Sequence, residues 1–226
     1  LRIGKETNRA ADVYKLDNSI LHTVNECRDL GVVVDPLLKF TTHINSVVAK
    51  AQQRAGLIFK TFTSGNRSLL VKAFTTYVRP ILEYGSCVWS PTAVGLIDKL
   101  ESVQRRFTKR IHGLQELSYR KRLELLNLDS LECRRLRFDL ILAYKILFGY
   151  TDLDSDDYFV LNTSSTRGHQ YKLVPQHCKC NTRKSYFSFR VVRVWNDLPT
   201  FIVNFSTIVD FKRSLQNVRL SLFTRY

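Results

Sequence analysis

The segment from Leu70 to Arg110 decides the fold, and it reads LVKAFTTYVRPILEYGSCVWSPTAVGLIDKLESVQRRFTKR. Apolar residues recur in it every three or four positions, first at Leu70, Phe74, Tyr77, Val78, Ile81 and Leu82, and then at Ile97, Leu100, Val103, Phe107 and Ile111. Each series predicts an amphipathic helix that buries one stripe of side chains. Ser90 and Pro91 lie between the two series and predict the start of the second helix. Pro80 should kink the first helix near Tyr77, because it removes a backbone donor.

Three further helical patterns flank this segment. One begins at Thr41 or Thr42, either of which can cap it, and ends before Ser64-Gly65-Asn66. Another begins at Ser118, and the third begins at Asp129, which forms a capping box with Glu132. The middle of the chain is therefore predicted to be a five-helix bundle.

The two ends of the chain differ from the middle. Residues 12–35 alternate like short strands: Val13–Leu16, a turn at Asp17-Asn18, Ile20–Val24 and Leu30–Val34. Residues 187–195 form an apolar segment, and a helix capped by Ser206 follows, with Ile208, Phe211, Leu215 and Val218 facing inward. The predicted fold class is mainly α (α+β), with a small N-terminal β-hairpin or sheet remnant and a small basic C-terminal α unit.

Charge divides the chain further. The 226 residues carry a net charge of +15, which attracts nucleic acid or anionic lipid, although a purely solubilising excess is the alternative. Asp152, Asp154, Asp156 and Asp157 make residues 151–162 acidic, and clustered like charges resist packing. The predicted units are residues 1–38, a helical part at 39–150, an acidic linker at 151–162 and a basic C-terminal domain at 163–226.

Several classes of protein are disfavoured by composition. No apolar run approaches the roughly 20 residues that span a bilayer. The five cysteines form an odd set without a signal peptide, so we expect reduced thiols in an intracellular protein, nuclear or cytoplasmic. The chain has no Met, even at position 1, so we expect it to be part of something longer. No Gly-rich phosphate loop or nucleophile–base pair is recognisable.

Two basic clusters are candidate nucleic-acid contacts. The first is Arg105, Arg106, Lys109 and Arg110, whose side chains lie mostly off the apolar stripe. They either follow phosphates or form a solvated helix end that the helix dipole favours. The second cluster is Arg120, Lys121, Arg122, Arg134, Arg135 and Arg137. It either contacts nucleic acid or pairs with Glu124, Glu132 and Asp139.

Aromatic and metal-binding candidates have alternatives too. Trp89 either stacks on a base or belongs to the core, and we expect core for both Trp89 and Trp195. His169, His177, Cys178 and Cys180 either bind zinc or form a polar loop with reduced thiols. The Cys-x-Cys spacing is tighter than that of usual structural zinc pairs, and no second pair follows.

Ordered blocks along the chain resemble a known family. They are DLGVVVD (29–35), HINSVVAKA (43–51), YVRPILEYGSCVWSP (77–91), LESVQRRFTKRI (100–111), SYRKRLELLNLDSLECRR (118–135) and YKILFG (144–149). The tail blocks are RGH (167–169) and FRVVRVWNDLP (189–199), followed by the final helix with Phe211 and Lys212. Together they resemble the C-terminal part, thumb and C-terminal domain, of reverse transcriptases from non-LTR retrotransposons (LINE elements) of the jockey and chicken-repeat type.

The resemblance implies roles for several residues. Leu30 and Gly31 would lie at the end of the polymerase palm near the primer terminus, with residues 1–38 as the end of the palm. The helices between Thr41 and His112 would form a thumb that holds the template–primer duplex. The expected nucleic-acid-binding residues are Leu30, Gly31, Arg105, Arg106, Lys109, Arg110, Arg120, Arg122, Arg134 and Arg135. The expected partners are an RNA template, a DNA primer and the upstream palm and fingers of the same polyprotein.

Catalysis is not expected from this chain alone. In the resembling family a hairpin with paired aspartates precedes the Leu-Gly segment and holds two divalent metals, Mg²⁺, whereas Asp156-Asp157 lies on the other side of the thumb. We expect no catalytic residue, metal or cofactor in this chain. The predicted function is that of a fragment of an RNA-directed DNA polymerase that clamps its duplex. The alternative is a non-catalytic, retrotransposon-derived scaffold that binds nucleic acid or protein.

Overall fold

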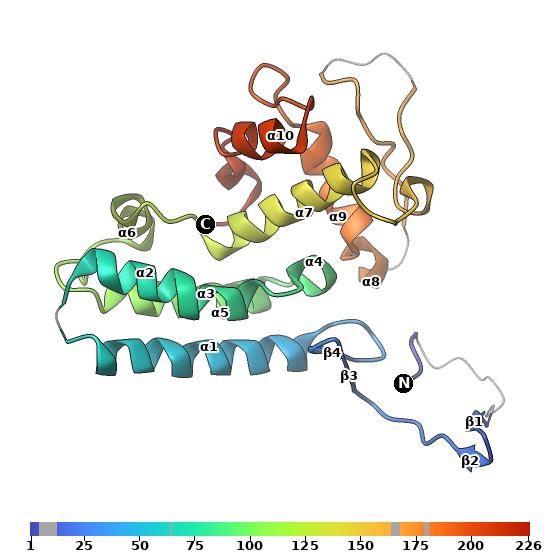
Figure 1. Ribbon diagram of the computed structural model, residues 1–226, viewed down its shortest axis with the longest axis horizontal. Coiled ribbons are helices and arrows are strands. Elements are labelled where there is room, and N and C mark those ends of the chain that lie inside the picture. Colours follow the sequence, from blue (N-terminus) through green and yellow to red (C-terminus); the bar gives the residue numbers. More distant parts are fainter. Residues whose placement is uncertain (5–12, 64, 164–167, 179–180) are drawn as a thin grey trace.

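The computed structural model describes residues 1–4, 13–63, 65–163, 168–178 and 181–226. Helices dominate it, and two small antiparallel sheets lie near the N-terminus, which confirms the predicted fold class. In Figure 1 the helices form superposed layers, with α1 at one side of the molecule and α7, α9 and α10 at the other.

The two β-hairpins precede the helices. In the first, β1 (Lys15–Leu16) pairs with β2 (Ser19–Ile20) across the predicted Asp17-Asn18 turn. In the second, β3 (Cys27–Asp29) pairs with β4 (Val32–Val34) so that Asp29 faces Val32. Leu30 and Gly31 form the turn, with φ angles of 42° and 85°. The prediction that Leu30 begins a strand is therefore wrong: a two-residue hairpin turn needs positive φ at both central positions.

The first helices follow the predicted pattern, with different ends. Helix α1 (Thr41–Thr61) is preceded by Phe40 as its N-cap residue, with no side-chain cap, so the predicted threonine cap is wrong. Its predicted end includes Ser64, which lies outside the described residues. Helix α2 (Arg67–Tyr77) is capped by Asn66, and α3 (Arg79–Glu83) contains Pro80 in its first turn. The break falls at Val78, beside the predicted kink.

A short helix occupies the Trp-Ser-Pro corner. Helix α4 (Ser86–Trp89) was not predicted; it begins after Gly85, whose φ is 63°. Helix α5 (Val94–Lys109) begins after Ala93 rather than at Ser90-Pro91. The predicted start at Ser90 is wrong, because Ser90 is the C-cap residue of α4. Its backbone N–H donates a hydrogen bond to the carbonyl of Ser86.

Helices α6 (Tyr119–Leu126) and α7 (Leu131–Leu147) follow. Ser118 caps α6 as predicted, accepting a hydrogen bond from the backbone of Lys121. The cap of α7 is Ser130 and not Asp129, since the Ser130 hydroxyl accepts the N–H of Cys133. Asp129 pairs with Arg137 instead.

The C-terminal part packs back onto α7. It contains η1 (Ser155–Asp157), α8 (Asn181–Lys184), α9 (Phe187–Asn196), α10 (Ile208–Leu215) and η2 (Leu220–Phe223). The apolar segment at 187–195 is therefore the helix α9. Helix α10 is capped by Thr207, not by the predicted Ser206. Phe211, Leu215 and Val218 are buried as predicted, and Ile208 is partly buried.

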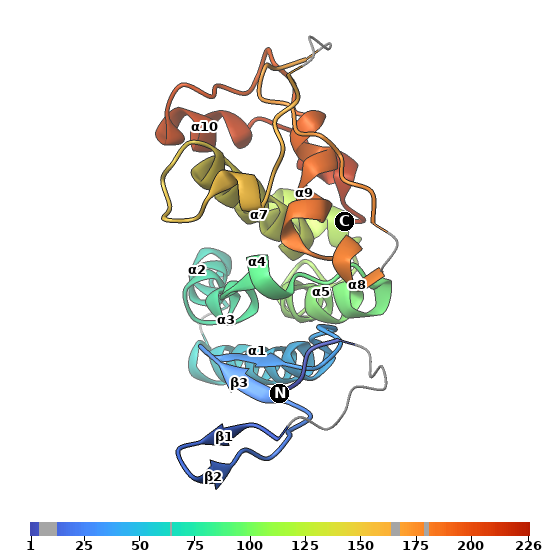
Figure 2. The same cartoon turned by 90° about the vertical axis from the view of Figure 1, so that its right-hand side faces the viewer.

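Two hydrophobic cores meet within α7. One runs from Val32 to Leu131 and joins α1 to α5; the other runs from Cys133 to Leu220 and joins α7 to α9 and α10. Figure 2 shows the C-terminal part lying over the α1–α5 layers. The acidic stretch predicted as a linker contributes Phe159, which is buried in the second core. The change of core thus lies at the first turn of α7, upstream of residues 151–162.

The described residues contain no helix that combines the length and the apolar character needed to cross a membrane.

Candidate nucleic-acid interface

Three exposed cations lie in line along α5 and its C-cap. Lys99, Arg106 and Arg110 are spaced by seven and four residues, which places them within one narrow stripe of an α-helix. All three are exposed. Lys99 donates a hydrogen bond to the Asn45 side chain of α1, with Nζ and Oδ1 2.7 Å apart. None has an ion-pair partner within the described part of the chain, so the charges of this α5 stripe are uncompensated.

A groove between α1 and α5 runs beside the stripe. Its volume is about 410 Å³. Its lining combines an apolar floor with a polar and cationic rim: Gln52, Ala55, Gly56, Phe59, Val103, Arg106, Phe107, Lys109 and Arg110. We call this feature the α1–α5 groove. Cations at the rim of an apolar groove present charge to a polyanion while their stems cover the floor.

Arg110 and Gly56 shape the end of the groove. The Arg110 guanidinium lies 4.1 Å from the centroid of the Phe59 ring, so a cation–π contact positions it. A Cβ added at Gly56 would meet nothing within 4 Å, which leaves the α1 wall open. The structure thus brings together three residues of the first predicted cluster, Arg106, Lys109 and Arg110.

Arg105 points away from its cluster. Its guanidinium lies 5.3 Å from the ring centroid of Tyr119 and 4.8 Å from that of Tyr226. It belongs to a different cavity, lined by α6, α7 and the C-terminal segment. The prediction that Arg105 shares a surface with Arg106 is therefore wrong, because adjacent residues on a helix point about 100° apart.

Arg122 serves the interior of the fold. Only 4% of its surface is exposed, although it lies in the basic run Arg120–Arg122 of the sequence. Its guanidinium donates hydrogen bonds to the Thr108 hydroxyl and to the carbonyls of Arg105 and Leu117. These bonds tie the end of α5 to α6. The predicted nucleic-acid contact at Arg122 is therefore wrong.

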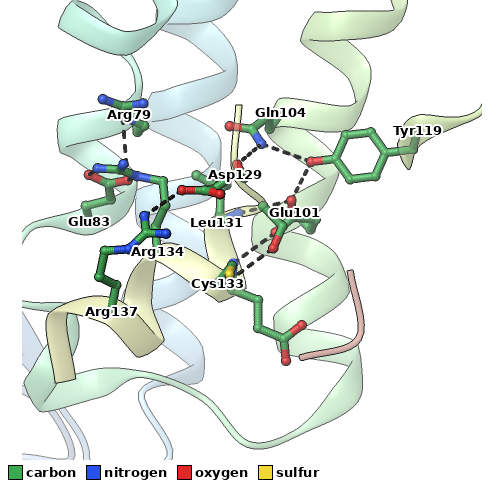
Figure 3. A network of polar contacts seen from close by, with 12 residues as sticks. Arg79, Glu83, Glu101, Gln104, Tyr119, Asp129, Leu131, Cys133, Arg134 and Arg137 are labelled. Atoms are coloured by element: carbon green, nitrogen blue, oxygen red, sulfur yellow. Dashed lines mark hydrogen bonds and ion pairs between the residues drawn. The ribbon is translucent and has the colours of Figure 1, made fainter. Parts of the chain in front are cut away.

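Four other cations of the second predicted cluster form ion pairs. Arg134 binds both oxygens of Glu83 on α3, and Arg137 binds Asp129 (Figure 3). On the exposed side of α6, Arg120 and Lys121 share Glu124, with closest nitrogen–oxygen distances of 3.8 and 3.2 Å. The alternative in which the second cluster pairs with acidic residues therefore holds for Glu124. Asp139 pairs with Arg190 instead, and Glu132 accepts the backbone N–H of Arg225.

A buried carboxylate joins α5 to the start of α7. Glu101 accepts a hydrogen bond from the Tyr119 hydroxyl and the backbone N–H groups of Leu131 and Glu132 (Figure 3). Burial raises the pKa of Glu101, and these three donors oppose the shift. Arg135 is 2% exposed, and its two terminal nitrogens have no hydrogen-bond partner in the described structure. The predicted nucleic-acid role of Arg135 is wrong, because its guanidinium is buried and interacts with the buried carboxylates of Glu101 and Asp139.

A second buried pair joins the two cores. Asp139 on α7 binds Arg190 on α9 through two bonds of 2.8 and 2.9 Å, and Arg190 also donates to the carbonyl oxygens of Ser185 and Cys87. Burial raises the pKa of Asp139, with Arg190 opposing the shift, and burial raises the pKa of the Cys87 thiol to about 12. Through these bonds the Asp139–Arg190 pair links α4, α7 and α9.

Leu30 and Gly31 lie apart from the α5 cations. Their hairpin packs at the start of α1, where the Val33 N–H donates to His43 Nδ1 over 3.3 Å. Phe59 and Arg110 mark the other end of α1, about 24 Å away along the helix. Figure 1 shows β3 and β4 at one end of α1, far from α6. The Tyr84 hydroxyl donates to the Leu30 carbonyl, which fixes the turn to α3.

The two tryptophans have structural roles, whereas the zinc candidates lie partly outside the described residues. Trp89 and Trp195 are buried and donate to the carbonyl oxygens of Tyr84 and Tyr171, which confirms the core prediction. For the zinc hypothesis, Cys180 lies outside the described residues, as does Arg167 of the RGH block. No group of three or more His, Cys, Asp or Glu side chains able to hold a metal occurs in the described ranges. His169 is buried, with Nε2 bound to the Trp195 carbonyl.

Sequence reasoning missed Lys99, Phe59 and Gly56. The seven-residue spacing of Lys99 and Arg106 was a usable signal, because it puts two cations on one helix face. Gly56 was another, since a glycine inside a helical pattern costs about 1 kcal/mol relative to alanine and calls for a reason. Phe59 gave no such signal, because its spacing equally suits a core position.

Comparisons with known proteins are sparse. No family model matches the sequence, and no solved structure matches it. An uncharacterized protein of Caenorhabditis elegans is 31% identical over 128 residues, which is 55% of this chain and 65% of that protein. The chain thus spans just under two thirds of that relative's length. The relative's name assigns it no activity.

Proposed function

We propose that this chain is the thumb and C-terminal part of a non-LTR retrotransposon reverse transcriptase and that its α1–α5 groove holds a template–primer duplex. The observation that carries the proposal is the α5 stripe, with Lys99, Arg106 and Arg110 in line and uncompensated beside a groove. The ordered sequence blocks support the family assignment. The helical fold is compatible with a thumb.

The chemistry of the groove favours a polyanion that is bound without regard to its base sequence. Cations on one helix face neutralise phosphates and release counterions, and they carry no base information. The groove rim offers Arg106, Lys109 and Arg110 for such contacts. In the parent enzyme the groove would keep the primer end near a metal site in an upstream palm, where two Mg²⁺ ions would support nucleotide transfer. An RNA template, a DNA primer and that palm with its fingers would be the partners.

Charge reversal of the groove rim tests the proposal. The variant Arg106→Glu/Lys109→Glu/Arg110→Glu should bind a 20-base-pair RNA–DNA duplex at least tenfold more weakly than the unaltered chain, measured by fluorescence anisotropy at fixed salt. A matched control is Lys72→Glu/Arg193→Glu/Lys212→Glu, which changes three exposed cations outside both cavities. Equal losses in the two triple variants would reduce the effect to net charge and overturn the assignment of the groove.

Exposed apolar residues favour a second candidate, a protein-interaction scaffold without a polymerase. Leu30 is 86% exposed, and Tyr84, whose hydroxyl binds its carbonyl, is 62% exposed. Val88 lies on the following helix, α4, and is 61% exposed. Exposed apolar surface of this kind marks protein contacts. A scaffold would keep its protein partner after charge reversal at Arg106, Lys109 and Arg110 and lose it after Tyr84→Ser/Val88→Ser, whereas duplex binding would respond in the opposite way.

A further inference from the structure

A second and larger cavity lies on another side of α5. It has a volume of about 1110 Å³ and opens between α6, the start of α7 and the C-terminal segment. Its walls include Tyr119 and Leu123 of α6, Cys133 of α7 with the N-cap residue Ser130, and Tyr226. We call it the α6–α7 cavity. Its volume lies at the upper end of the range that is usual for ligand sites, so it has room for a short segment of a polymer.

The cavity carries an excess of positive charge. Five arginines line it, Arg105, Arg120, Arg134, Arg137 and Arg225, against the two carboxylates of Glu124 and Asp129. Arg134 and Arg137 are matched by Glu83 and Asp129, and Arg120 shares Glu124 with Lys121. Arg105 and Arg225 have no ion-pair partner within the described ranges. Glu132 lies close, but its carboxylate accepts the backbone N–H of Arg225.

Arg105 is held in a fixed position on two aromatic rings. It lies 5.3 Å from the centroid of Tyr119 and 4.8 Å from that of Tyr226, and these rings meet edge to face at 6.1 Å. Both hydroxyls are anchored, that of Tyr119 on Glu101 and that of Tyr226 on Asp98. The result is a preorganised aromatic and cationic platform, which binds a ligand with little entropic cost of ordering its own side chains.

The geometry points to the α6–α7 cavity as a binding site for single-stranded nucleic acid, separate from the α1–α5 groove. A single strand exposes the faces of its bases, which stack on aromatic rings and guanidinium planes, whereas a duplex hides them. Guanidinium groups also bind phosphate oxygens in a bidentate manner. The Arg105 guanidinium would stack on a base and bind a phosphate, and Arg225 would bind a second phosphate. This site is independent of whether a duplex occupies the groove.

Substitution of the two unpaired arginines tests this site. The full chain carrying Arg105→Ala/Arg225→Ala should bind a fluorescent 12-nucleotide oligo(U) at least tenfold more weakly at fixed salt. Its log–log salt slope should fall in magnitude by about 1.4, because each phosphate of a single strand that is no longer neutralised lowers the slope by roughly 0.7. Arg105→Lys keeps the charge but not the planar stack, so it should retain the salt slope and still reduce affinity. Binding of the RNA–DNA duplex should change less than twofold.

Controls separate the two sites and the type of ligand. Arg193→Ala/Arg213→Ala removes two exposed arginines that line neither cavity, and it should leave oligo(U) affinity within twofold. Unchanged oligo(U) binding in Arg105→Ala/Arg225→Ala, with an unaltered circular dichroism spectrum and thermal midpoint, would overturn the proposal. Displacement of oligo(U) from the unaltered chain by an oligo(Glu) peptide at equal concentration would overturn it as well, since any polyanion would then suffice. Failure of the duplex experiment would leave these outcomes unaffected.

Discussion

The exposed cations along α5 differ in what surrounds them from the interior cations Arg122 and Arg134 of α6 and α7, although Arg106 and Arg122 both lie in short basic runs of the sequence. Lys99, Arg106 and Arg110 face solvent without a carboxylate. Arg122 is bound by a hydroxyl and two carbonyls inside the protein, and Arg134 is bound by Glu83. The first set retains its charge for a ligand, whereas the second uses its hydrogen bonds to join helices. A basic run therefore predicts an anion site only where its tertiary neighbours leave it unpaired.

The largest effect on the free energy of unfolding is expected at the Asp139–Arg190 pair. Asp139→Asn removes the buried carboxylate that binds Arg190, so the Arg190 guanidinium loses its ion-pair partner, and Arg135 loses one of the carboxylates near it. Breaking a buried pair in this way costs about 3–5 kcal/mol. Urea denaturation measures the loss. The control Asp210→Asn breaks an exposed pair with Arg213 and should cost less than about 1 kcal/mol. Equal losses would contradict the distinction between buried and exposed pairs.

The next largest effect on stability distinguishes the interior Arg122 from the exposed Arg106. Arg122→Met removes the donor to the Leu117 carbonyl, the donor to the buried Thr108 hydroxyl and one of the donors to the Arg105 carbonyl, and we expect a loss of about 2–3 kcal/mol in the free energy of unfolding. Arg106→Met should change stability by less than about 0.5 kcal/mol, as exposed substitutions do, and should weaken duplex binding. Denaturation and anisotropy on both variants give the comparison. Duplex affinity that falls more in folded Arg122→Met than in Arg106→Met would contradict it.

Much of the fold was predictable from apolar spacing, because stripes of Leu, Val, Ile and Phe specify helices locally. The predicted helices correspond to α1, α2 with α3, α5, α6 and α7. Their exact starts were not predictable where two candidate caps stood side by side, as with Asp129 and Ser130: the choice depends on Asp129 meeting Arg137.

The candidate site was predictable only in part. Arg106, Lys109 and Arg110 follow from the off-stripe positions of one helix. Arg122 and Arg135 sit in equally basic surroundings, yet their burial is set by α5, which lies elsewhere in the sequence. Sequence spacing within one helix carries no information about such a neighbour. The same limit explains why Arg105 was grouped with Arg106.

The buried side chain of His43 makes the stability of the protein depend on pH. Burial lowers the pKa of His43, and Lys50 and Arg28 lower it further. The unfolded chain keeps the ordinary pKa of 6.5, so below that pH it binds more protons than the folded chain and stability falls. The loss at pH 5.5 should be at most about 1.4 kcal/mol from this imidazole. Urea denaturation at pH 7.5 and 5.5 should show a smaller pH effect in His43→Gln than in the unaltered chain. An identical pH effect in the two proteins would contradict the assignment.

The smallest effect concerns the open wall of the α1–α5 groove. Gly56→Ala should raise the free energy of unfolding by up to about 1 kcal/mol, because alanine favours the helix and its Cβ meets no atom within 4 Å. Gly56→Phe places a ring beside Phe59 and should reduce duplex affinity without unfolding the chain. Thermal unfolding and anisotropy measure the pair. Unchanged affinity in Gly56→Phe would show that the ligand does not enter the groove.

The salt dependence of duplex binding tests the central claim most directly. Lys99→Ala/Arg106→Ala/Arg110→Ala removes the α5 stripe, and Lys72→Ala/Arg193→Ala/Lys212→Ala removes the same charge from other exposed positions. Each phosphate contact on duplex DNA contributes about 0.9 to the log–log slope. We expect the slope to fall in magnitude by about 2.7 in the first variant and by less than about 0.5 in the second. Equal slopes in the two variants would contradict the claim that the unpaired cations of α5 form the interface.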